Sequence, residues 1–533
     1  MRTPTYPGVY VEEIPSGVHP IAGVSTSDTA FVDFFLEGPV GVATRVGGFD
    51  EFTRRFGALT PKSSAGYGVM QYFTNGGQVA WIVRVATDSA QPSSATLDTG
   101  GSGPGGPTLV VSAISPGEWG DSLQVGVDYR VDDRTTQFNL VVRRTATVGG
   151  RVRVVASEVH RNVRMAASGP RNVLAVVTAA SSLITVTEAD GGVGERPAET
   201  AGDVTSAAVL TSAAATGFIP LGQGIDGGAP GADQLRTGLA ALERIEPAVV
   251  NLLCIPAAAT LDEDAIGSTP NLAAVAGEVA EFCERYRCFH LVDIPQGVDT
   301  TERMVAWLDQ NNVRDRNAAV AFPRLKIVDP DPDRDGALLD VASSGTLAGL
   351  IARTDTDRGV WKAPAGTATQ LRSVVTPSGP RLNDDDSAVL NPLGVNVIRT
   401  LPVYGIVSWG ARTLFGADVQ TSEWKYVPVR RTALYLEESL RQGLRWVVFE
   451  PNDEGLWSQI RLNVGAFMQS LFRRGAFQGR TPREAYLVKC DSDTTTQADI
   501  DRGIVNVLVG FAPLKPAEFV FIQLQQLTRP PEQ

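Results

Sequence analysis

The pattern that decides the fold lies in residues 430–479, which read RRTALYLEESLRQGLRWVVFEPNDEGLWSQIRLNVGAFMQSLFRRGAFQG. Ala433, Leu436 and Leu440 recur at helical spacing. Gly443 can close that helix in the left-handed conformation. The apolar run 446–449, which a proline stops, predicts a short strand. A second helix follows, so the stretch is interpreted as helix, strand, helix.

The second helix carries a wide apolar stripe. Asn452 and Asp453 are natural N-cap residues, and Gly475 ends the helical pattern. Between them, apolar side chains step every fourth residue, at Leu456, Ile460, Val464, Met468 and Phe472. A helix with so wide a stripe has to bury it, so we expect this helix to lie in a core.

Acidic residues exceed basic ones: 59 Asp and Glu stand against 47 Lys and Arg, a formal charge of −12. This balance argues against a protein that coats nucleic acid, which needs clustered Lys and Arg. The N-terminus shows no signal peptide, and no run of about 18 apolar residues predicts a membrane span. Four cysteines in 533 residues do not make a disulfide scaffold. We expect a cytoplasmic protein of roughly three or four domains that contacts neither nucleic acid nor membrane.

Strand-like and helix-like segments alternate in two parts of the chain. Before residue 88, we expect strands at 30–36 and 79–85 and helices at 49–56 and 67–73. Between 219 and 365, we expect strands at 248–255, 289–294 and 318–322 and helices at 272–286, 301–310 and 345–353. Apolar strands that alternate with helices predict a parallel sheet with helices on its faces.

A different composition separates these two parts. Residues 99–107, TGGSGPGGP, are rich in Gly and Pro and predict a linker. Runs of β-branched residues separated by turn residues follow as far as residue 218. This pattern predicts an inserted all-β domain.

Both ends of the chain read as extended segments without an obvious partner. In the N-terminal segment, Pro7 and Pro15 bound a short extended run. In the C-terminal segment, residues 518–527 are expected to form a long apolar strand. An open strand edge is a template for pairing with another chain, so we expect the ends to add strands to neighbouring subunits. The residues expected in these contacts are Tyr6, Val9, Tyr10, Val11, Phe519, Val520, Phe521, Ile522 and Leu524. If each subunit gives its arms to the next, the contact is heterologous and can propagate as a helix.

Several motifs resemble those of contractile tail sheath proteins, which occur in phage tails and related contractile injection systems. Near the C-terminus they are WVVFEPN (446–452), GAFQG (475–479), AYLV (485–488) and APLKPAEF (512–519). Upstream they are AGLIARTD (348–355), RGVWKAPAG (358–366) and WGART (409–413). Their order along the chain carries the resemblance, which covers both ends and the α/β part but only weakly the inserted segment.

The resemblance implies a mixed α/β, multidomain fold: an α/β sheath core with an inserted all-β domain and extended N- and C-terminal arms. The implied segments are an N-terminal arm (1–25), the first part of the core (26–98), a β-rich outer domain (99–218), an α/β sheath domain (219–410), a tube-facing C-terminal domain (411–516) and a C-terminal strand arm (517–533).

The same resemblance implies a structural subunit that is not an enzyme and needs no cofactor. Such a subunit polymerises helically around an inner tube and contracts to drive the tube through a target envelope. Baseplate and cap proteins are further implied partners, and the implied setting is a phage-tail-like particle assembled in the cytoplasm. An α/β hydrolase or dehydrogenase and a static tube or capsid component remain as alternatives.

Two patterns raise the question of enzyme or metal chemistry. Residues 222–227, GQGIDG, fit the GxGxxG fingerprint, but residues 228–233 intervene before the next helix, which a dinucleotide loop does not allow. Cys283, Cys288 and His290 lie close in sequence, yet no fourth zinc ligand is near them. We therefore expect a turn in the first case and core residues in the second, with no metal site.

One charged feature stands out in this acidic chain. Between Glu454 and Glu484 there is no acidic residue, whereas Arg461, Arg473 and Arg474 lie there. Two interpretations stay open: Arg473 and Arg474 complement the dipole at a helix C-terminus, or the arginines contact an acidic partner. In the sheath family the tube is held by the C-terminal domain, which makes these three residues the candidate tube contacts.

Overall fold

The protein is described by a computed structural model over residues 19–99, 106–148, 150–165, 169–190, 194–245, 249–261, 271–331, 334 and 336–521. Its centre is an eight-stranded sheet of order β18-β17-β13-β12-β11-β1-β3-β2. Neighbours from β17 to β3 are parallel, and β18 and β2 pair antiparallel at the two edges. The strands are β1 (Thr29–Asp33), β2 (Thr44–Val46), β3 (Ala80–Arg84), β11 (Leu252–Cys254), β12 (Phe289–Val292), β13 (Ala318–Phe322), β17 (Val395–Leu401) and β18 (Gly405–Ser408).

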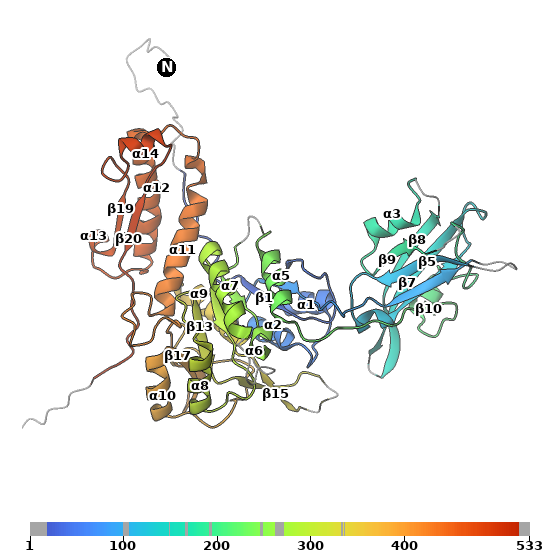
Figure 1. Cartoon of the computed structure of the whole chain (residues 1–533), viewed down its shortest axis with the longest axis horizontal. Coiled ribbons are helices and arrows are strands. Elements are labelled where there is room, and N and C mark those ends of the chain that lie inside the picture. The colour runs from blue at the N-terminus through green and yellow to red at the C-terminus, as the bar shows by residue number, and fades with distance from the viewer. Residues whose placement is uncertain are drawn as a thin grey trace, which may run out of the picture.

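Helices cover both faces of this sheet, as the alternating sequence predicts (Figure 1). Ala30 and Val32 of β1 pack into one apolar core, and Phe31 packs into the other, because successive side chains of a strand point to opposite faces. The first core is completed by α5 (Ala232–Leu242), α6 (Ala257–Thr260), α7 (Asn271–Tyr286), α8 (Thr301–Asn311) and α10 (Asp384–Leu390). The second is completed by α1 (Phe49–Phe56), α2 (Ser64–Asn75), α9 (Ser344–Arg358) and α11 (Val427–Gly443). The mixed α/β prediction is confirmed.

Two smaller features flank the sheet. A three-stranded sheet has the order β15-β14-β16, with β14 (Leu325–Val328), β15 (Leu338–Val341) and β16 (Thr376–Pro377). The edge of β18 is covered, because Gly366 and Leu371 donate backbone hydrogen bonds to Ser408 and Ile406 at 2.9 and 2.8 Å.

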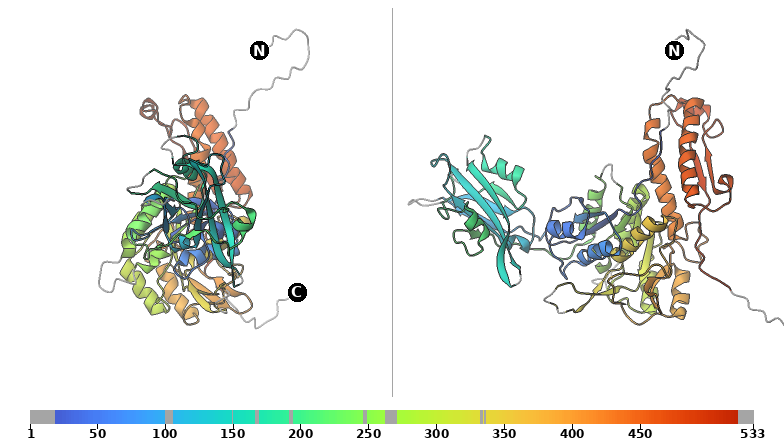
Figure 2. Two further views of the ribbon diagram at one scale, coloured as in Figure 1. Left: turned by 90° about the vertical axis from the view of Figure 1, so that its right-hand side faces the viewer. Right: turned by 180° about the vertical axis from the view of Figure 1, so that it is seen from behind.

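Residues 94–220 form a module that stands apart from this body (Figures 1 and 2). Two sheets, β10-β6-β7-β8 and β4-β5-β9, enclose an apolar core of their own. The strands are β4 (Ser94–Asp98), β5 (Pro107–Ala113), β6 (Leu123–Asp128), β7 (Gln137–Val148), β8 (Arg151–Arg164), β9 (Ile184–Glu188) and β10 (Ile219–Pro220). The module also contains η1 (Glu118–Ser122), α3 (Val173–Ala180) and α4 (Ala207–Thr211), which the β-branched composition did not predict.

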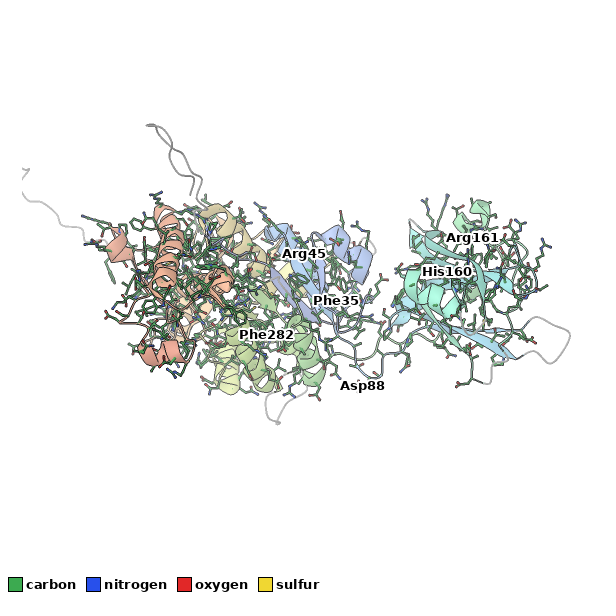
Figure 3. The ribbon with its side chains drawn as sticks, turned by 90° about the horizontal axis from the view of Figure 1, so that it is seen from above. Phe35, Arg45, Asp88, His160, Arg161 and Phe282 are labelled. Carbon is green, nitrogen blue, oxygen red and sulfur yellow. The ribbon has the colours of Figure 1, made fainter. Side chains whose placement is uncertain are left out.

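A narrow neck joins the module to the body, where Figure 3 labels Asp88 between Phe35 of the body and His160 of the module. The outgoing and returning chains run side by side there, since Gln91 bridges to Ile225 and Ser94 bridges to Gly222.

Arg84, at the end of β3, is fully buried at this neck. Its guanidinium donates to backbone carbonyls within residues 35–38 at 2.8–3.1 Å and to the Pro116 carbonyl at 2.6 Å. Arg144 of the module forms an ion pair with Glu37 of the body at 2.7 Å. These bonds tie the module to the body through charged side chains rather than through a shared apolar core.

The C-terminal part packs as a separate unit beside the body (Figure 1). It contains α11, η4 (Arg445–Val447), α12 (Glu454–Arg473), α13 (Pro482–Ala485), α14 (Gln497–Asp501), and an antiparallel pair of β19 (Tyr486–Lys489) and β20 (Leu508–Phe511). The buried stripe of α12 is confirmed for Leu456, Ile460, Val464 and Met468, whereas Phe472 is only half-buried.

The strand expected at residues 446–449 is wrong. The chain reverses direction between α11 and α12 in a turn of 3₁₀ helix, and Phe449 has a φ of 73°. Trp446 and Val447 pack against the core of the C-terminal unit instead of pairing with a strand. A four-residue apolar run does not distinguish a strand from a tight connection between helices.

Candidate functional site

Helix α12 begins where the sequence predicts. The Asp453 side chain accepts a hydrogen bond from the Leu456 backbone N–H at 2.9 Å, which caps the helix. Arg461 lies off the buried stripe, but it already has partners within the subunit. It donates to Glu454 at 2.6 Å, to the Ser458 hydroxyl at 2.8 Å and to the Cys490 carbonyl.

Arg473 and Arg474 are exposed at the C-terminal end of α12. The Arg474 guanidinium lies over the Trp361 ring, 5.2 Å from its centroid. The structure therefore separates the three candidate tube contacts: Arg461 is bonded to its own unit, whereas Arg473 and Arg474 are exposed next to each other.

The strands β19 and β20 form a sheet of only two strands. Val488 and Val509 face the core of the C-terminal unit, whereas Leu487 and Leu508 are each 52% exposed. Within the described residues, no third strand pairs with either outer edge. A two-stranded sheet is marginal by itself, and its free edges present backbone N–H and C=O groups for further strands.

The first described residues of the chain lie against the C-terminal unit, beside α11 and α12. The His19 ring stacks on Trp446 with centroids 4.2 Å apart, and the His19 N–H donates to Asn463 at 3.3 Å. Ile21 packs in the same apolar core. Gly23 lies so close to Tyr435 that a Cβ at this position would meet the tyrosine hydroxyl at 2.0 Å. Residues 19–24 are thus held on the C-terminal unit, whereas the Ser25 hydroxyl donates to Asn251 of the body at 3.0 Å.

After β20 the chain runs back from the C-terminal unit to the α/β body. The side chain that contacts the body there is Glu518. Glu518 receives two hydrogen bonds from the Arg412 guanidinium, at 2.8 and 2.5 Å. The side chain of Arg412 is only 1% exposed. Its backbone is held in turn by Asn396 of β17, which accepts from the Arg412 N–H at 2.7 Å and donates to its carbonyl at 2.8 Å.

The described residues after Glu518 are exposed to solvent. Phe519, Val520 and Phe521 are 67%, 80% and 90% exposed and belong to no strand of this subunit. The other arm residues expected from the sequence, Tyr6, Val9, Tyr10, Val11, Ile522 and Leu524, lie outside the described residues.

A cavity of about 660 Å³ lies between the outgoing segment 514–518 and the body. Its lining includes four basic side chains, Arg358, Lys362, Arg474 and Lys515, together with Trp361 and Trp409. The segment therefore passes over a hollow rather than over a packed surface.

The GQGIDG sequence does not adopt a dinucleotide-binding geometry. Its residues form the returning half of the neck, as the bridges at Gly222 and Ile225 show. Asp226 accepts from Lys62 at 2.7 Å and from the Glu118 backbone N–H at 2.9 Å. The segment has a structural place, as expected, but it runs extended between two bridges instead of forming the expected turn.

Cys283, Cys288 and His290 are buried in the apolar core, and burial lowers the pKa of His290 to about 4. Across the part of the chain that the structure describes, no three His, Cys, Asp or Glu residues gather as metal ligands.

At the carboxyl ends of the parallel strands, where α/β enzymes bind their ligands, polar groups are buried. Asp33 accepts backbone hydrogen bonds from Phe34 at 2.6 Å and from Ala257 at 2.9 Å, and Asp293 accepts from the Ser344 N–H at 2.9 Å. Burial, with the nearby charge of Asp293, raises the pKa of Asp33 to about 7. The N-terminus of α9 covers Asp293, which is buried.

The profile of the phage tail sheath C-terminal domain matches residues 419–526. Residues 419–526 are therefore similar to a phage tail sheath C-terminal domain. The matched range contains all of α11 to β20 and the segment with Glu518, and the expected resemblance is confirmed.

Curated relatives agree with the sheath domain. The chain is 28% identical over 229 residues to a prophage major tail sheath protein of Pseudomonas aeruginosa, and this match covers 40% of the chain and 56% of that protein. It is 28% identical over 196 residues to the tail sheath protein of Burkholderia phage BcepMu, across 35% of the chain and 40% of that protein. The chain thus spans about half the length of the curated relatives that it matches.

Solved structures share the fold over nearly the whole chain. The contracted helical sheath of the anti-feeding prophage superposes with a TM-score of 0.54 at 21% identity, covering 98% of this chain and 100% of that one. A sheath tail protein from Listeria innocua gives 0.57 at 12% identity, covering 93% and 96%. None of the described helices is long and apolar enough to cross a bilayer.

Sequence reasoning missed the pairing of Arg412 with Glu518. Both residues lie in motifs that carried the resemblance, WGART and APLKPAEF, but 106 positions separate them and neither motif points to the other.

Proposed function

We propose that this chain is the structural, non-enzymatic subunit of a contractile sheath that polymerises helically around an inner tube. The observation that carries the proposal is the pair of complementary features in the C-terminal unit. A two-stranded sheet has no third strand along either edge in the described structure, and the described residues 519–521 are exposed and belong to no strand. Free edges and unpaired extended segments join by strand addition.

The arms, residues 1–17 and 517–533, supply strands to the β19–β20 sheets of neighbouring subunits in this proposal. A heterologous contact of this kind does not close on a pair and therefore extends into a helix. Contraction rotates near-rigid subunits about the arm roots while the strands stay paired. The relatives include sheaths described in a contracted state, which supports a sheath rather than a static tube or capsid component.

Assembly of the purified chain tests the proposal. Size-exclusion chromatography and electron microscopy are expected to show polymers without any added cofactor. A monodisperse monomer or small oligomer at high concentration contradicts the proposal and favours an α/β enzyme. The particle is proposed to assemble in the cytoplasm with tube, baseplate and cap proteins, away from nucleic acid and membrane.

Arg473 and Arg474, with Arg461 as a third candidate, are proposed to contact the inner tube. An exposed ion pair is worth about 0.2–1 kcal/mol, so many weak pairs can hold a tube and still release it during firing. The structure favours Arg473 and Arg474 for this role, because Arg461 is bonded to Glu454 of its own helix.

Charge reversal tests this contact. Arg473→Glu with Arg474→Glu is expected to give sheaths without tube or with premature contraction, and adding Arg461→Glu is expected to add little to this defect. The matched control is Arg54→Glu with Arg55→Glu, an exposed arginine pair in the last turn of α1. Electron microscopy at low and high salt compares the two variants. Extended, tube-filled sheaths at the unaltered yield in the first variant show that the arginines only complement the dipole of α12.

A further inference from the structure

We propose that Arg412 and Glu518 form a clasp that fixes the point at which the C-terminal arm leaves the subunit. The hinge of the arm then lies after Glu518 and not after β20. This inference rests on the proposed exchange of arms between subunits. It assigns Arg412 as a positioning residue for the arm.

The first argument is the geometry of the ion pair. Arg412 presents two of its N–H groups to the two oxygens of Glu518, at 2.8 and 2.5 Å, a fork that a lysine cannot reproduce. The Tyr426 hydroxyl adds a third bond to Glu518 at 3.3 Å. Glu518 is therefore held in one position from three donors.

The second argument is the support behind Arg412. Its remaining guanidinium nitrogen bonds to the Asn391 carbonyl at 2.9 Å and to Asp418 at 3.0 Å. Asn396, on a strand of the eight-stranded sheet, holds the Arg412 backbone on both its N–H and its C=O. Burial alone lowers the pKa of Arg412, but the hydrogen bond and charge of Glu518 raise it. The clasp is thus built on the large central sheet.

The third argument is the position of Glu518 along the segment. In the described part of residues 514–521, Glu518 is the residue whose side chain hydrogen-bonds the body. The segment borders a cavity of about 660 Å³, and its apolar residues Leu514 and Pro516 are only half-buried. Exposure then rises from 16% at the Glu518 side chain to 67% at Phe519. The ion pair thus lies at the point where the chain changes from half-buried to exposed.

Proteolysis of the full chain tests the clasp before any assembly. At a concentration at which the chain is monomeric, the protease Glu-C cleaves after Glu518 only when that side chain is released. Arg412→Lys is expected to raise the rate of this cut about tenfold, because a charge-assisted fork is replaced by a single contact. The matched control is Arg324→Lys, which removes a buried arginine–carboxylate pair with Asp340 far from the arm. Equal cleavage rates in the two variants overturn the proposal.

A second variant keeps the test valid if Arg412→Lys fails to fold. Nitroxides are placed at Ala517→Cys, immediately before Glu518, and at Gln310→Cys on α8, because both positions are exposed and the four native cysteines are buried. The distance distribution between the labels is expected to be narrow when Glu518 is present and clearly broader in the Glu518→Gln variant. An unchanged distribution overturns the clasp. Both readouts come from single subunits, so a failure of polymerisation, which contradicts the proposed function, leaves them unaffected.

Polymerisation then shows whether the clasp matters for exchange. Glu518→Gln is expected to form fewer and less regular polymers than Lys515→Gln, an exposed neighbour without a hydrogen bond to the body in the described structure. Regular polymers at equal yield from both variants overturn the positioning role of the clasp in assembly.

Discussion

The eight-stranded sheet and the two-stranded β19–β20 sheet differ in how far the subunit itself covers them. The large sheet has helices on both faces, and the segment around Leu371 covers its β18 edge. The small sheet has one face on the core of the C-terminal unit, and its outer edges are open in the described structure. The difference separates what a subunit needs to fold from what it offers to a neighbour.

The largest effect on folding is expected in the large sheet. Phe322, the last residue of β13, is fully buried. Phe322→Ala removes an aromatic ring from a packed core and is expected to cost about 3–5 kcal/mol of unfolding free energy. Chemical denaturation of the variant measures this loss. A cost below about 1 kcal/mol means that the large sheet is not the folding core.

The neck of the outer module is expected to give the next largest effect. Arg84→Met leaves buried carbonyl acceptors without a donor and is expected to cost roughly 2–3 kcal/mol. The module core contains no residue of the body, so its own fold is expected to persist. Small-angle scattering is expected to show a wider spread of module positions, and an unchanged profile contradicts the role of Arg84 at the neck.

The two chain segments of the neck lie close enough to be joined directly, which allows the module to be deleted. Replacing Asp88–Gly227 by a direct joint between Thr87 and Gly228 uses two residues already in contact, since Gly228 N–H donates to Thr87 at 3.2 Å. We expect a peripheral module, so polymers become thinner but still form. Loss of assembly in electron micrographs places the module in the sheath core instead.

The pH dependence of stability is expected to differ between the two regions. The pKa of Asp33 in the large sheet is raised to about 7, so the folded protein keeps a proton that the unfolded chain releases near pH 4. Stability therefore falls as pH rises from about 4 to 7, by at most about 1.4 kcal/mol per pH unit, and levels off above that window. Denaturation at several pH values is expected to show this loss relative to Asp33→Asn. A constant difference between the two proteins contradicts it.

The pKa of Asp499 in the C-terminal unit is shifted in the opposite direction to that of Asp33. Hydrogen bonds from Thr496 lower its pKa, so its contribution is present at neutral pH and is lost as pH falls below the normal aspartate range. Asp499→Asn is expected to lose stability at pH 7 and to match the unaltered protein in acid, which denaturation at the two pH values measures.

The smallest effect on folding is expected at the open sheet. Leu487 on β19 is 52% exposed, so Leu487→Ser is expected to change the unfolding free energy by less than about 0.5 kcal/mol. Polymer yield is nevertheless expected to fall, because the proposed assembly adds a neighbour's strand to this sheet. Val155→Ser, at a strand position of the module that is 51% exposed, is the matched control. Equal yields from the two variants contradict strand addition at β19.

The sequence predicted the parts of the fold that local patterns specify. β13 and α1 have the predicted bounds, and the stripe of α12 faces a core as its four-residue spacing requires. The run 446–449 was misread, because the reversal between two helices, and not the propensity of the run, decides its conformation.

The candidate site was less predictable than the fold. The exposed segment at Phe519 was expected from its apolar pattern, and the bounds of the outer domain remain a prediction. Arg84 and Arg412 were not expected, because each depends on partners that only the folded chain brings near. Sequence spacing carries no signal for such long-range contacts.

The most direct test of strand exchange compares two C-terminal truncations by electron microscopy. Removing residues 519–533 deletes the apolar arm but keeps the Glu518 clasp, whereas removing 528–533 leaves the predicted strand 518–527 intact. Burial of an exchanged apolar strand at about 25 cal/mol per Å² is expected to supply several kcal/mol per contact, less the cost of ordering. We expect folded subunits without polymers from the first truncation and normal polymers from the second. Polymers of normal length and yield from the first truncation contradict the account.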